Sequence, residues 1–300
     1  MDIGSNSIKC LIAEWQDRTH FNCIYDDYAV TRIGELSHQT KTLIEPAMER
    51  SRLAIKKFLT IAKAYHVQSV IAVATMALRV ATNAQTFIHR IKSETGISIK
   101  ILSGDDEAKL SYQGAISTLP IHDNDYSLVF DNGGGSTELI VGKGKDILEV
   151  KSLPLGAVMM MQTFFQDNPV SISAISDADQ YIKETLNQFD CDYPFKLLIG
   201  IGGTSTTMGA VNLKLHTYAP HLIHGSVLTS NEVNRQISLY HSMTIEQRKT
   251  IQGLSPDRAD IILPGACVVR QIIKKCQLNQ LTISDQGLRH GVFFSSFESQ

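Results

Sequence analysis

Two short segments of this chain repeat one pattern, which constrains the fold more than any other feature. DIGSNS at 2–7 and DNGGGST at 131–137 each place a glycine two residues after an aspartate and lead into a strand-like stretch. Glycine permits the tight turn that such a pattern requires. The separation of 129 positions between Asp2 and Asp131, in a chain of 300, predicts two domains of similar build.

Between the two turns, strand and helix patterns alternate, which is typical of an α/β fold. A stretch rich in Pro, Asp and Asn at 118–126 predicts a linker. We therefore expect an N-terminal domain at 1–120 and a second domain at 121–287, with a C-terminal helix at about 288–300 returning to the first. The predicted elements of the first domain are strands at 8–15, 67–75 and 97–102 and helices at 41–65, 79–95 and 103–117.

Composition and charge exclude several classes of function. With 43% hydrophobic residues, 19% charged residues and a net charge of −2, the chain has a globular composition and no field that attracts nucleic acid or anionic lipid. It lacks a bilayer-spanning apolar stretch and a signal-peptide pattern, so we expect a cytoplasmic protein with neither membrane nor nucleic-acid partners. The cysteine spacing matches no disulfide or zinc pattern and predicts buried reduced thiols at Cys10, Cys23, Cys191, Cys267 and Cys276.

Glycine turns beside hydroxyl side chains are candidate phosphate sites. Consecutive glycines let several backbone amides converge on one anion, because no Cβ blocks the approach. The alternative interpretation of each turn is a tight bend with no ligand. The candidates are Gly133, Gly134 and Gly135 with Ser136 and Thr137, inside a predicted hairpin at 126–144, and Gly202, Gly203 and Thr204, between an apolar run and a predicted helix.

Three carboxylates are candidates for the chemistry. Asp131 enters the first of these glycine turns and Glu138 leaves it. Carboxylate oxygens beside a phosphate cradle are typical of Mg²⁺ binding, although two solvated charges at a strand edge remain the alternative. Glu107 falls in the first turn of the helix that Ser103 caps, where it is either functional or a stabiliser of the helix dipole.

Nine segments spread over nearly the whole chain carry a resemblance to a known family. They are DIGSNS (2–7), ALRVATN (77–83), SGDDEAKLSYQG (103–114), DNGGGSTEL (131–139), SLPLGAV (152–158), GIGGTSTT (200–207), HGSVLT (224–229), GLSPDRADIILPGA (253–266) and SDQGLRHG (284–291). In this order they resemble the exopolyphosphatase/guanosine pentaphosphate phosphohydrolase family. The blocks at 131–139 and 253–266 are the most specific part of the match.

The resemblance implies two ribonuclease H-like domains, as in actin-like ATPases, with a site in the cleft between them. It also implies a hydrolase of the stringent response that uses Mg²⁺, or alternatively Mn²⁺, to remove the terminal phosphate of polyphosphate or guanosine pentaphosphate. By resemblance, Glu107 is the catalytic glutamate, and Asp131 and Glu138 bind the metal. The implied phosphate or substrate contacts are Ser5, Asn6, Ser7, Arg79, Gly133, Gly134, Gly135, Ser136, Thr137, Gly202, Gly203, Thr204 and Arg258.

The chain departs from the family pattern at Lys109, Met159 and His290. Met159 stands where the family usually has a basic residue, and the chain ends without the family's additional helical domain, so we expect a preference for short anionic substrates. Only Met1 precedes Asp2, where the family has half a strand, which indicates a natural start further upstream.

Two alternatives of different classes stay open. One is a small-molecule kinase of the same superfamily, which needs a hydroxyl acceptor in place of water. The other is a non-catalytic sensor that binds guanosine tetraphosphate or pentaphosphate, against which the retained Glu107 argues. The sequence leaves the oligomeric state open, with a homodimer as one expectation.

Overall fold

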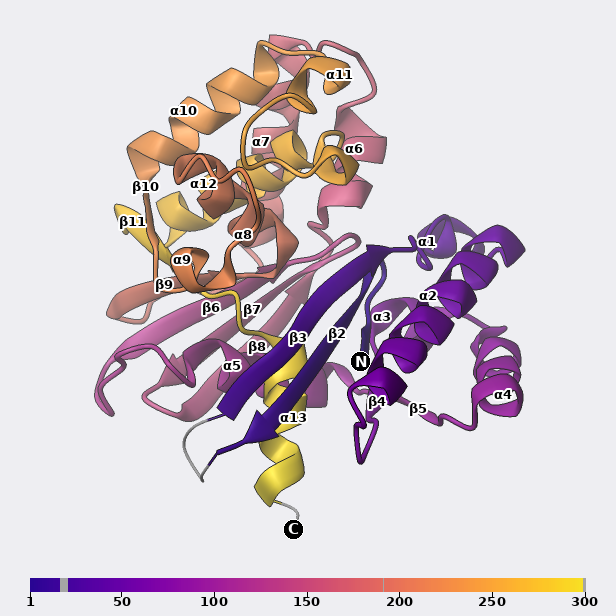
Figure 1. The fold of residues 1–300 in the computed structure, drawn as a ribbon. Coiled ribbons are helices and arrows are strands. Elements are labelled where there is room, and N and C mark those ends of the chain that lie inside the picture. The colour runs from indigo at the N-terminus through magenta and orange to yellow at the C-terminus, as the bar shows by residue number, and fades with distance from the viewer. Residues whose placement is uncertain (17–20, 191, 299–300) are drawn as a thin grey trace. The chain divides into compact units, whose positions relative to one another are not determined.

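The computed structural model describes residues 1–16, 21–190 and 192–298, and the chain divides into two compact units (Figure 1). Unit 1 is Met1–Gly114 together with Leu288–Gln300, and unit 2 is Ala115–Gly287. The first division lies six residues before the boundary expected from composition, within the last turn of the helix Gly104–Ile116. Each unit has its own sheet and its own hydrophobic core.

The described part of unit 1 contains a five-stranded sheet in the order β3-β2-β1-β4-β5. Its first three strands form an antiparallel meander, and the last two run parallel to β1. In β2, Ile8, Cys10 and Ile12 are buried on one face, as the period of two in the sequence requires. The strands are β1 (Asp2–Ile3), β2 (Ser7–Trp15), β3 (Phe21–Val30), β4 (Ala72–Ala74) and β5 (Ile99–Ile101).

The helices of unit 1 follow the predicted order with two corrections. The helix predicted at 79–95 is two helices, because the side chain of Asn83 bonds both backbone groups of Leu43 and interrupts the helical run. The strand predicted at 67–75 is only β4, which pairs with the short strands β1 and β5. The helices are α1 (Ser37–Thr40), α2 (Glu45–Ala64), α3 (Met76–Val80), α4 (Ala84–Thr95), α5 (Gly104–Ile116) and α13 (Leu288–Glu298).

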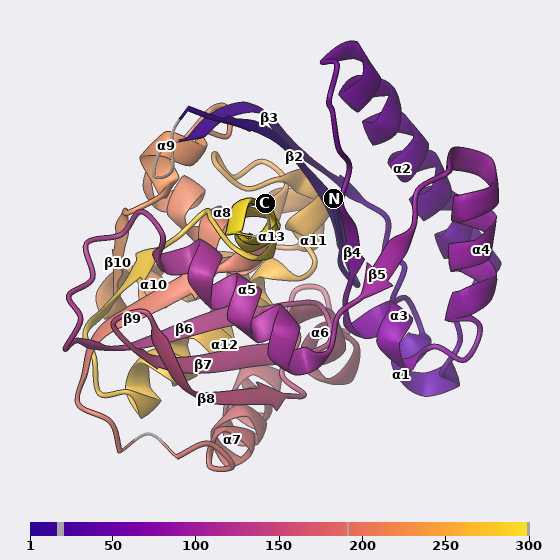
Figure 2. The same cartoon turned by 90° about the horizontal axis from the view of Figure 1, so that it is seen from below.

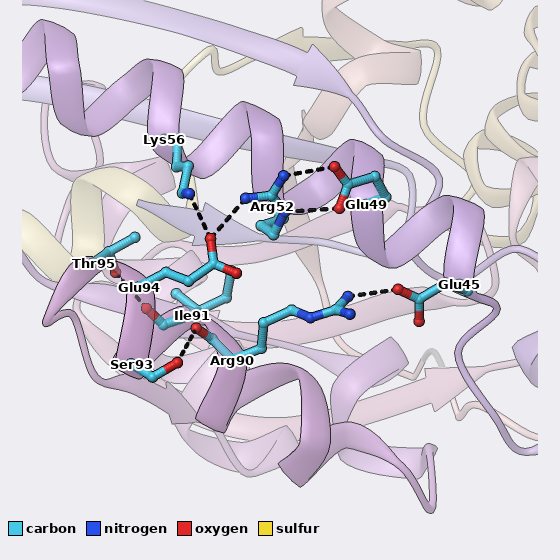
Figure 3. Close-up of polar contacts among 9 residues, drawn as sticks. All are labelled: Glu45, Glu49, Arg52, Lys56, Arg90, Ile91, Ser93, Glu94 and Thr95. Atoms are coloured by element: carbon cyan, nitrogen blue, oxygen red, sulfur yellow. Dashed lines mark hydrogen bonds and ion pairs between the residues drawn. The ribbon is translucent and has the colours of Figure 1, made fainter.

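Helices α2 and α4 are linked by a set of surface ion pairs (Figure 3). Arg52 and Lys56 of α2 both contact Glu94 of α4, at 2.7 and 2.5 Å, while Arg90 of α4 contacts Glu45 of α2 at 2.6 Å. Exposed pairs of this kind contribute at most ~1 kcal/mol each. The packing of the two helices therefore depends mainly on their buried apolar faces, which include Phe58, Phe87 and Ile91.

Helix α13 carries the end of the chain back onto the sheet of unit 1. Arg289 forms a bidentate ion pair with Asp26 of β3, with Nε to Oδ1 at 2.9 Å and Nη2 to Oδ2 at 2.8 Å. The ring of Phe293 stacks on Trp15 of β2 with centroids 4.6 Å apart. A polar clamp and an aromatic stack thus attach this helix to β2 and β3.

Unit 2 repeats the arrangement of unit 1. Its described residues form a six-stranded sheet in the order β10-β11-β9-β6-β7-β8. As in unit 1, the first three strands of the unit, β6, β7 and β8, form an antiparallel meander. On the other side of β6, the strands β9 and β11 run parallel to it, and β10 is an additional antiparallel edge strand. The strands are β6 (Tyr126–Asn132), β7 (Thr137–Lys143), β8 (Asp146–Leu153), β9 (Phe195–Ile201), β10 (Val227–Thr229) and β11 (Gln280–Ile283).

The core of unit 2 is built around α12, which is buried along most of its length because its first eight residues are all apolar. Figure 1 shows α8, α10 and α12 on one face of the sheet, and Figure 2 shows α12 behind the β6–β8 meander. The helices are α6 (Ala157–Phe164), α7 (Ile172–Leu186), α8 (Gly202–Asn212), α9 (Pro220–Ile223), α10 (Ser230–His241), α11 (Ile245–Arg248), the 3₁₀ helix η1 (Pro256–Arg258) and α12 (Ile262–Lys275).

Both units thus have the ribonuclease H-like strand order, and the predicted α/β class and internal repeat are confirmed. None of the described helices combines the length and the apolar character that crossing a bilayer requires. Among the described cysteines, Cys10 and Cys267 are buried thiols, as predicted. The same expectation is wrong for Cys23, which is exposed on the edge strand β3, and Cys191 lies outside the described residues.

Candidate functional site

The turn between β1 and β2 carries the candidates of the first glycine motif. The amide of Gly4 donates to the carbonyl of Ser7 at 3.1 Å, which closes a tight hairpin. Amides of the segment 31–34 donate to the carbonyls of Ser5 and Asn6. The amides of Ser5 and Asn6 themselves find no acceptor in the described part of the chain, so they are available to an anion.

Asp2 lies beside this turn and was missed by the sequence reasoning. Its side chain is buried, at 5% exposure, and its Oδ1 has no hydrogen-bond partner among the described residues. A buried carboxylate oxygen without a donor is costly, which makes it a candidate functional group. The signal was present in the repeat, because Asp2 occupies the position that Asp131 occupies in the second segment.

Glu107 lies in the first turn of α5, and the hydroxyl of Ser103 caps that helix by accepting the amide of Asp106 at 3.0 Å. Arg79 of α3 donates from Nη1 to Glu107 Oε2 at 2.9 Å and to the carbonyl of Leu102 at 2.9 Å. Arg79 was predicted as a substrate contact. The structure places its Nη1 against the predicted catalytic glutamate, and the predicted substrate contact stays a prediction.

The second glycine turn, between β6 and β7, uses the same backbone bonds as the first. The amide of Gly133 donates to the carbonyl of Ser136 at 2.9 Å. The carbonyls of Gly133 and Gly134 accept amides from 157–159, the first turn of α6. The amides of Gly134 and Gly135 have no acceptor within the described ranges, and two adjacent amides of this kind suit a phosphoryl oxygen.

The two carboxylates of this turn lie in one cross-strand row. Asp131 of β6 is directly opposite Glu138 of β7, and Glu138 is opposite Ser152 of β8, so the three side chains share a face of the sheet. Ser136 and Ser152 donate their hydroxyls to Glu138 Oε1 at 2.6 and 2.9 Å. Ser152 was not predicted, because only the strand register brings it to Glu138.

The third turn, at the start of α8, is shaped by two charged side chains. Gly202 has a φ of +75°, and a Cβ at this position would overlap Asp131 Oδ1. A Cβ on Gly203 would overlap the guanidinium of Arg258. Only glycine therefore leaves room for both groups. The turn lies against the Asp131 carboxylate at Gly202 and against the Arg258 guanidinium at Gly203.

Thr137 and Thr204 were predicted as phosphate contacts, but their side chains are engaged inside unit 2. Thr204 donates its hydroxyl to Asn132 Oδ1 at 2.9 Å, and Thr137 donates its own to the carbonyl of Leu155 at 2.9 Å. Both threonines are at most 3% exposed. Any contact that they make with a ligand must therefore use the backbone.

The described residues contain no group of three or more His, Cys, Asp or Glu side chains that could hold a metal ion. A site built wholly from protein ligands, as for structural zinc, therefore does not fit. Asp131 and Glu138 do fit Mg²⁺, which takes one or two carboxylates and completes its shell with water and phosphate oxygens.

The sequence profile of the Ppx/GppA phosphatase family matches residues 11–300. The chain is 34% identical, over 313 residues, to a bifunctional 3-dehydroquinate synthase/phosphatase of Fusobacterium nucleatum, and the match covers all of this chain and 46% of that protein. It is 27% identical to exopolyphosphatase 2 of Mycobacterium tuberculosis, covering 98% and 97% of the two chains. The crystal structure of an exopolyphosphatase from Cytophaga hutchinsonii superposes with a TM-score of 0.90 at 27% identity, covering 99% and 96%.

Proposed function

The chain belongs to the Ppx/GppA phosphatase family, and we propose that it is a phosphoanhydride hydrolase that removes the terminal phosphate of inorganic polyphosphate, of guanosine pentaphosphate, or of both. The observation that carries this proposal is the row of Asp131 and Glu138 beside a turn with two unengaged amides. A cation-binding pair next to an anion-binding turn is the combination that phosphoryl transfer requires. The relatives named as exopolyphosphatases support the same substrate class.

In the proposed reaction, the backbone turns bind the terminal phosphoryl group. In unit 2, the amides of Gly134 and Gly135 donate to its oxygens. In unit 1, the unengaged amides of Ser5 and Asn6 form a second group of anion donors. Such donors are fixed before substrate arrives and so stabilise the charge that develops in the transition state. Arg258, held against Gly203, adds a cation for the substrate.

Asp131 and Glu138 would hold Mg²⁺, and the hydroxyls of Ser136 and Ser152 orient Glu138 for that purpose. When bound, the ion neutralises charge on the transferred and leaving phosphate oxygens. Glu107 accepts a proton from the attacking water as the oxygen–phosphorus bond forms, and Arg79 keeps its carboxylate in place. The anhydride bond breaks, and the shortened phosphate chain leaves without a covalent enzyme intermediate.

The test is phosphate release from polyphosphates of graded length and from guanosine pentaphosphate, each with Mg²⁺. We expect immediate release in the absence of any other acceptor, with kcat/KM levelling off as the polyphosphate chain grows. An Asp131→Asn preparation made in parallel excludes a contaminating phosphatase. Release that begins only after a hydroxyl acceptor is added would identify a kinase instead, and tight binding without release would identify a sensor.

A further inference from the structure

We propose that Asn132 is a positioning residue that fixes the turn at Gly202–Thr204 against the turn at Gly133–Gly135 and thereby sets the affinity of unit 2 for a phosphoryl group. The proposal rests on the phosphate-binding role proposed above for these turns. Asn132 is the last residue of β6 and is 3% exposed. Neither charge nor a ligand explains why a polar amide is buried there.

The amide of Asn132 joins three separate segments of unit 2. Its Nδ2 donates to Thr137 Oγ1 at the start of β7 and to the carbonyl of Leu155 after β8, both at 2.8 Å. Its Oδ1 accepts the hydroxyl of Thr204 in the first turn of α8 at 2.9 Å. One side chain therefore connects the segment that follows the turn at Gly133–Gly135, the loop that leads into α6, and the helix that begins at the turn at Gly202–Thr204.

The direction of every bond in this network is determined. The carbonyl of Leu155 can only accept, so Nδ2 and not Oδ1 of Asn132 must face it. Thr137 donates to the same carbonyl at 2.9 Å and can therefore only accept from Asn132. Thr204 is left as the donor to Oδ1. Any other arrangement opposes two acceptors in a buried place, at a cost of ~1–3 kcal/mol for each unsatisfied group.

Close packing also excludes other positions for the network. Gly265 of α12 faces it, and a Cβ there would lie 2.7 Å from Thr204 Cγ2 and 3.1 Å from Asn132 Oδ1. Real Cβ atoms do not approach a carbon atom as closely as 2.7 Å, so the glycine lets α12 pack directly against Thr204 and Asn132. The two turns are therefore fixed relative to each other by one amide with a single hydrogen-bonding pattern.

The hairpin itself does not need this amide. In unit 1, the equivalent cross-strand pair is Ile3 opposite Ile8, both fully buried, and the tight turn has the same closing bond. In unit 2 the pair is Asn132 opposite Thr137. The contacts specific to Asn132 are therefore those with Leu155 and Thr204, and the contact with Thr204 concerns the turn at Gly202–Thr204.

The experiment compares the near-isosteric variant Asn132→Leu with Gln236→Leu. Gln236 is a matched control, because its buried amide bonds the carbonyl of Met208 and the hydroxyl of Tyr240 without touching either turn. Both variants should lower Tm. Only Asn132→Leu should raise KM for polyphosphate, by ~10-fold or more with kcat changed much less, because misplaced contacts weaken binding.

Two further variants show that the effect passes through Thr204. As a single substitution, Thr204→Val should raise KM. Combined with Asn132→Leu, it should raise KM by less than about 2-fold further, because both substitutions remove the same interaction. Asn132→Asp should raise KM as Asn132→Leu does, since a carboxylate cannot donate to Leu155. The proposal is overturned if the effects of Thr204→Val and Asn132→Leu on KM are additive. It is also overturned if Asn132→Leu raises KM no more than Gln236→Leu does.

Calorimetric titration with inorganic pyrophosphate separates this inference from the proposed function. Weaker pyrophosphate binding by Asn132→Leu than by wild type supports the positioning role even if no substrate is hydrolysed, which would be a failure of the proposed function alone. Equal pyrophosphate affinity in wild type, Asn132→Leu and Gln236→Leu overturns the positioning role whatever the activity.

Discussion

The hairpins that open the two units share a backbone and differ in side chains. In each, an amide closes the turn across three residues, from Gly4 to Ser7 and from Gly133 to Ser136. In each, amides from the segment after the third strand bond the carbonyls of the turn. The aspartate-glycine pattern common to the two segments thus specifies a tight turn in which the two amides after the closing glycine make no hydrogen bond among the described residues. It does not specify the side chains around the turn.

The side chains opposite the aspartates show what the difference means. In unit 1, Asp2 is opposite Lys9, while in unit 2, Asp131 is opposite Glu138. Like charges directly opposite destabilise an antiparallel pair, unless donors or a cation compensate them. In unit 2 the hydroxyls of Ser136 and Ser152 donate to Glu138, and the proposed cation would compensate the pair further, whereas unit 1 holds the ion pair of Glu107 with Arg79. We infer that cation binding and proton transfer are divided between the units.

The largest effect should come from removing the proposed base in unit 1. Glu107→Gln should lower kcat by ~10²–10⁴-fold, the contribution of general-base catalysis, while KM and the Mg²⁺ requirement change little. Steady-state phosphate release across a Mg²⁺ series measures all three quantities. Asp106→Asn, in the same helical turn, is the control and should be nearly silent. A wild-type kcat for Glu107→Gln would place the base elsewhere.

The carboxylate pair of unit 2 should show the complementary behaviour. Asp131→Asn and Glu138→Gln should each lower turnover by at least ~100-fold and raise the Mg²⁺ concentration needed for half-maximal activity, because a neutral oxygen is a poorer ligand. Glu149→Gln is the control, since Glu149 lies in the same meander and bonds Tyr193 instead. The proposed division between the units is wrong if the metal response of both carboxylate variants is unchanged.

A smaller effect on activity is expected from replacing Gly202, and Gly96, which has nearly the same φ, is its matched control. Gly202 has φ +75° and Gly96 has φ +76°, but a Cβ meets Asp131 only at Gly202 and open space at Gly96. Alanine should destabilise either position by ~1 kcal/mol through backbone strain. Denaturation should show similar losses, while activity should fall only in Gly202→Ala, by ~10-fold or more as Asp131 is displaced. Equal activities would contradict the role of Gly202 in placing Asp131.

The smallest expected effect is a pH response of unit 2. Burial lowers the pKa of His224, against a weaker opposing effect of Asp285. Since the folded pKa lies below the unfolded value of ~6.5, the unfolded chain binds a proton first as the pH falls. The contribution of neutral His224 to the free energy of unfolding is thus complete above the unfolded pKa and is lost as the pH falls below it. His224→Gln should flatten the dependence of Tm on pH between 7 and 5, whereas an unchanged slope would assign it to other groups.

Local patterns in the sequence determined the parts of the molecule that depend on neighbours along the chain. The glycine turns, the alternation of strands and helices, the capping of α5 by Ser103 and the repeat of two similar units all follow from short-range spacing. The break between α3 and α4 did not follow, because Asn83 bonds Leu43, which lies 40 positions away.

The tertiary structure alone decided which side chains meet. Ser152 reaches Glu138, and Asn132 reaches Thr204, through strand register and helix packing that no local pattern encodes. Arg79 contacts Glu107 for the same reason, across 28 positions of the chain. The sequence determined where backbone can turn and where charge is available, since those properties belong to single residues. The partner of each charge is a property of pairs, and only the folded chain brings the pairs together.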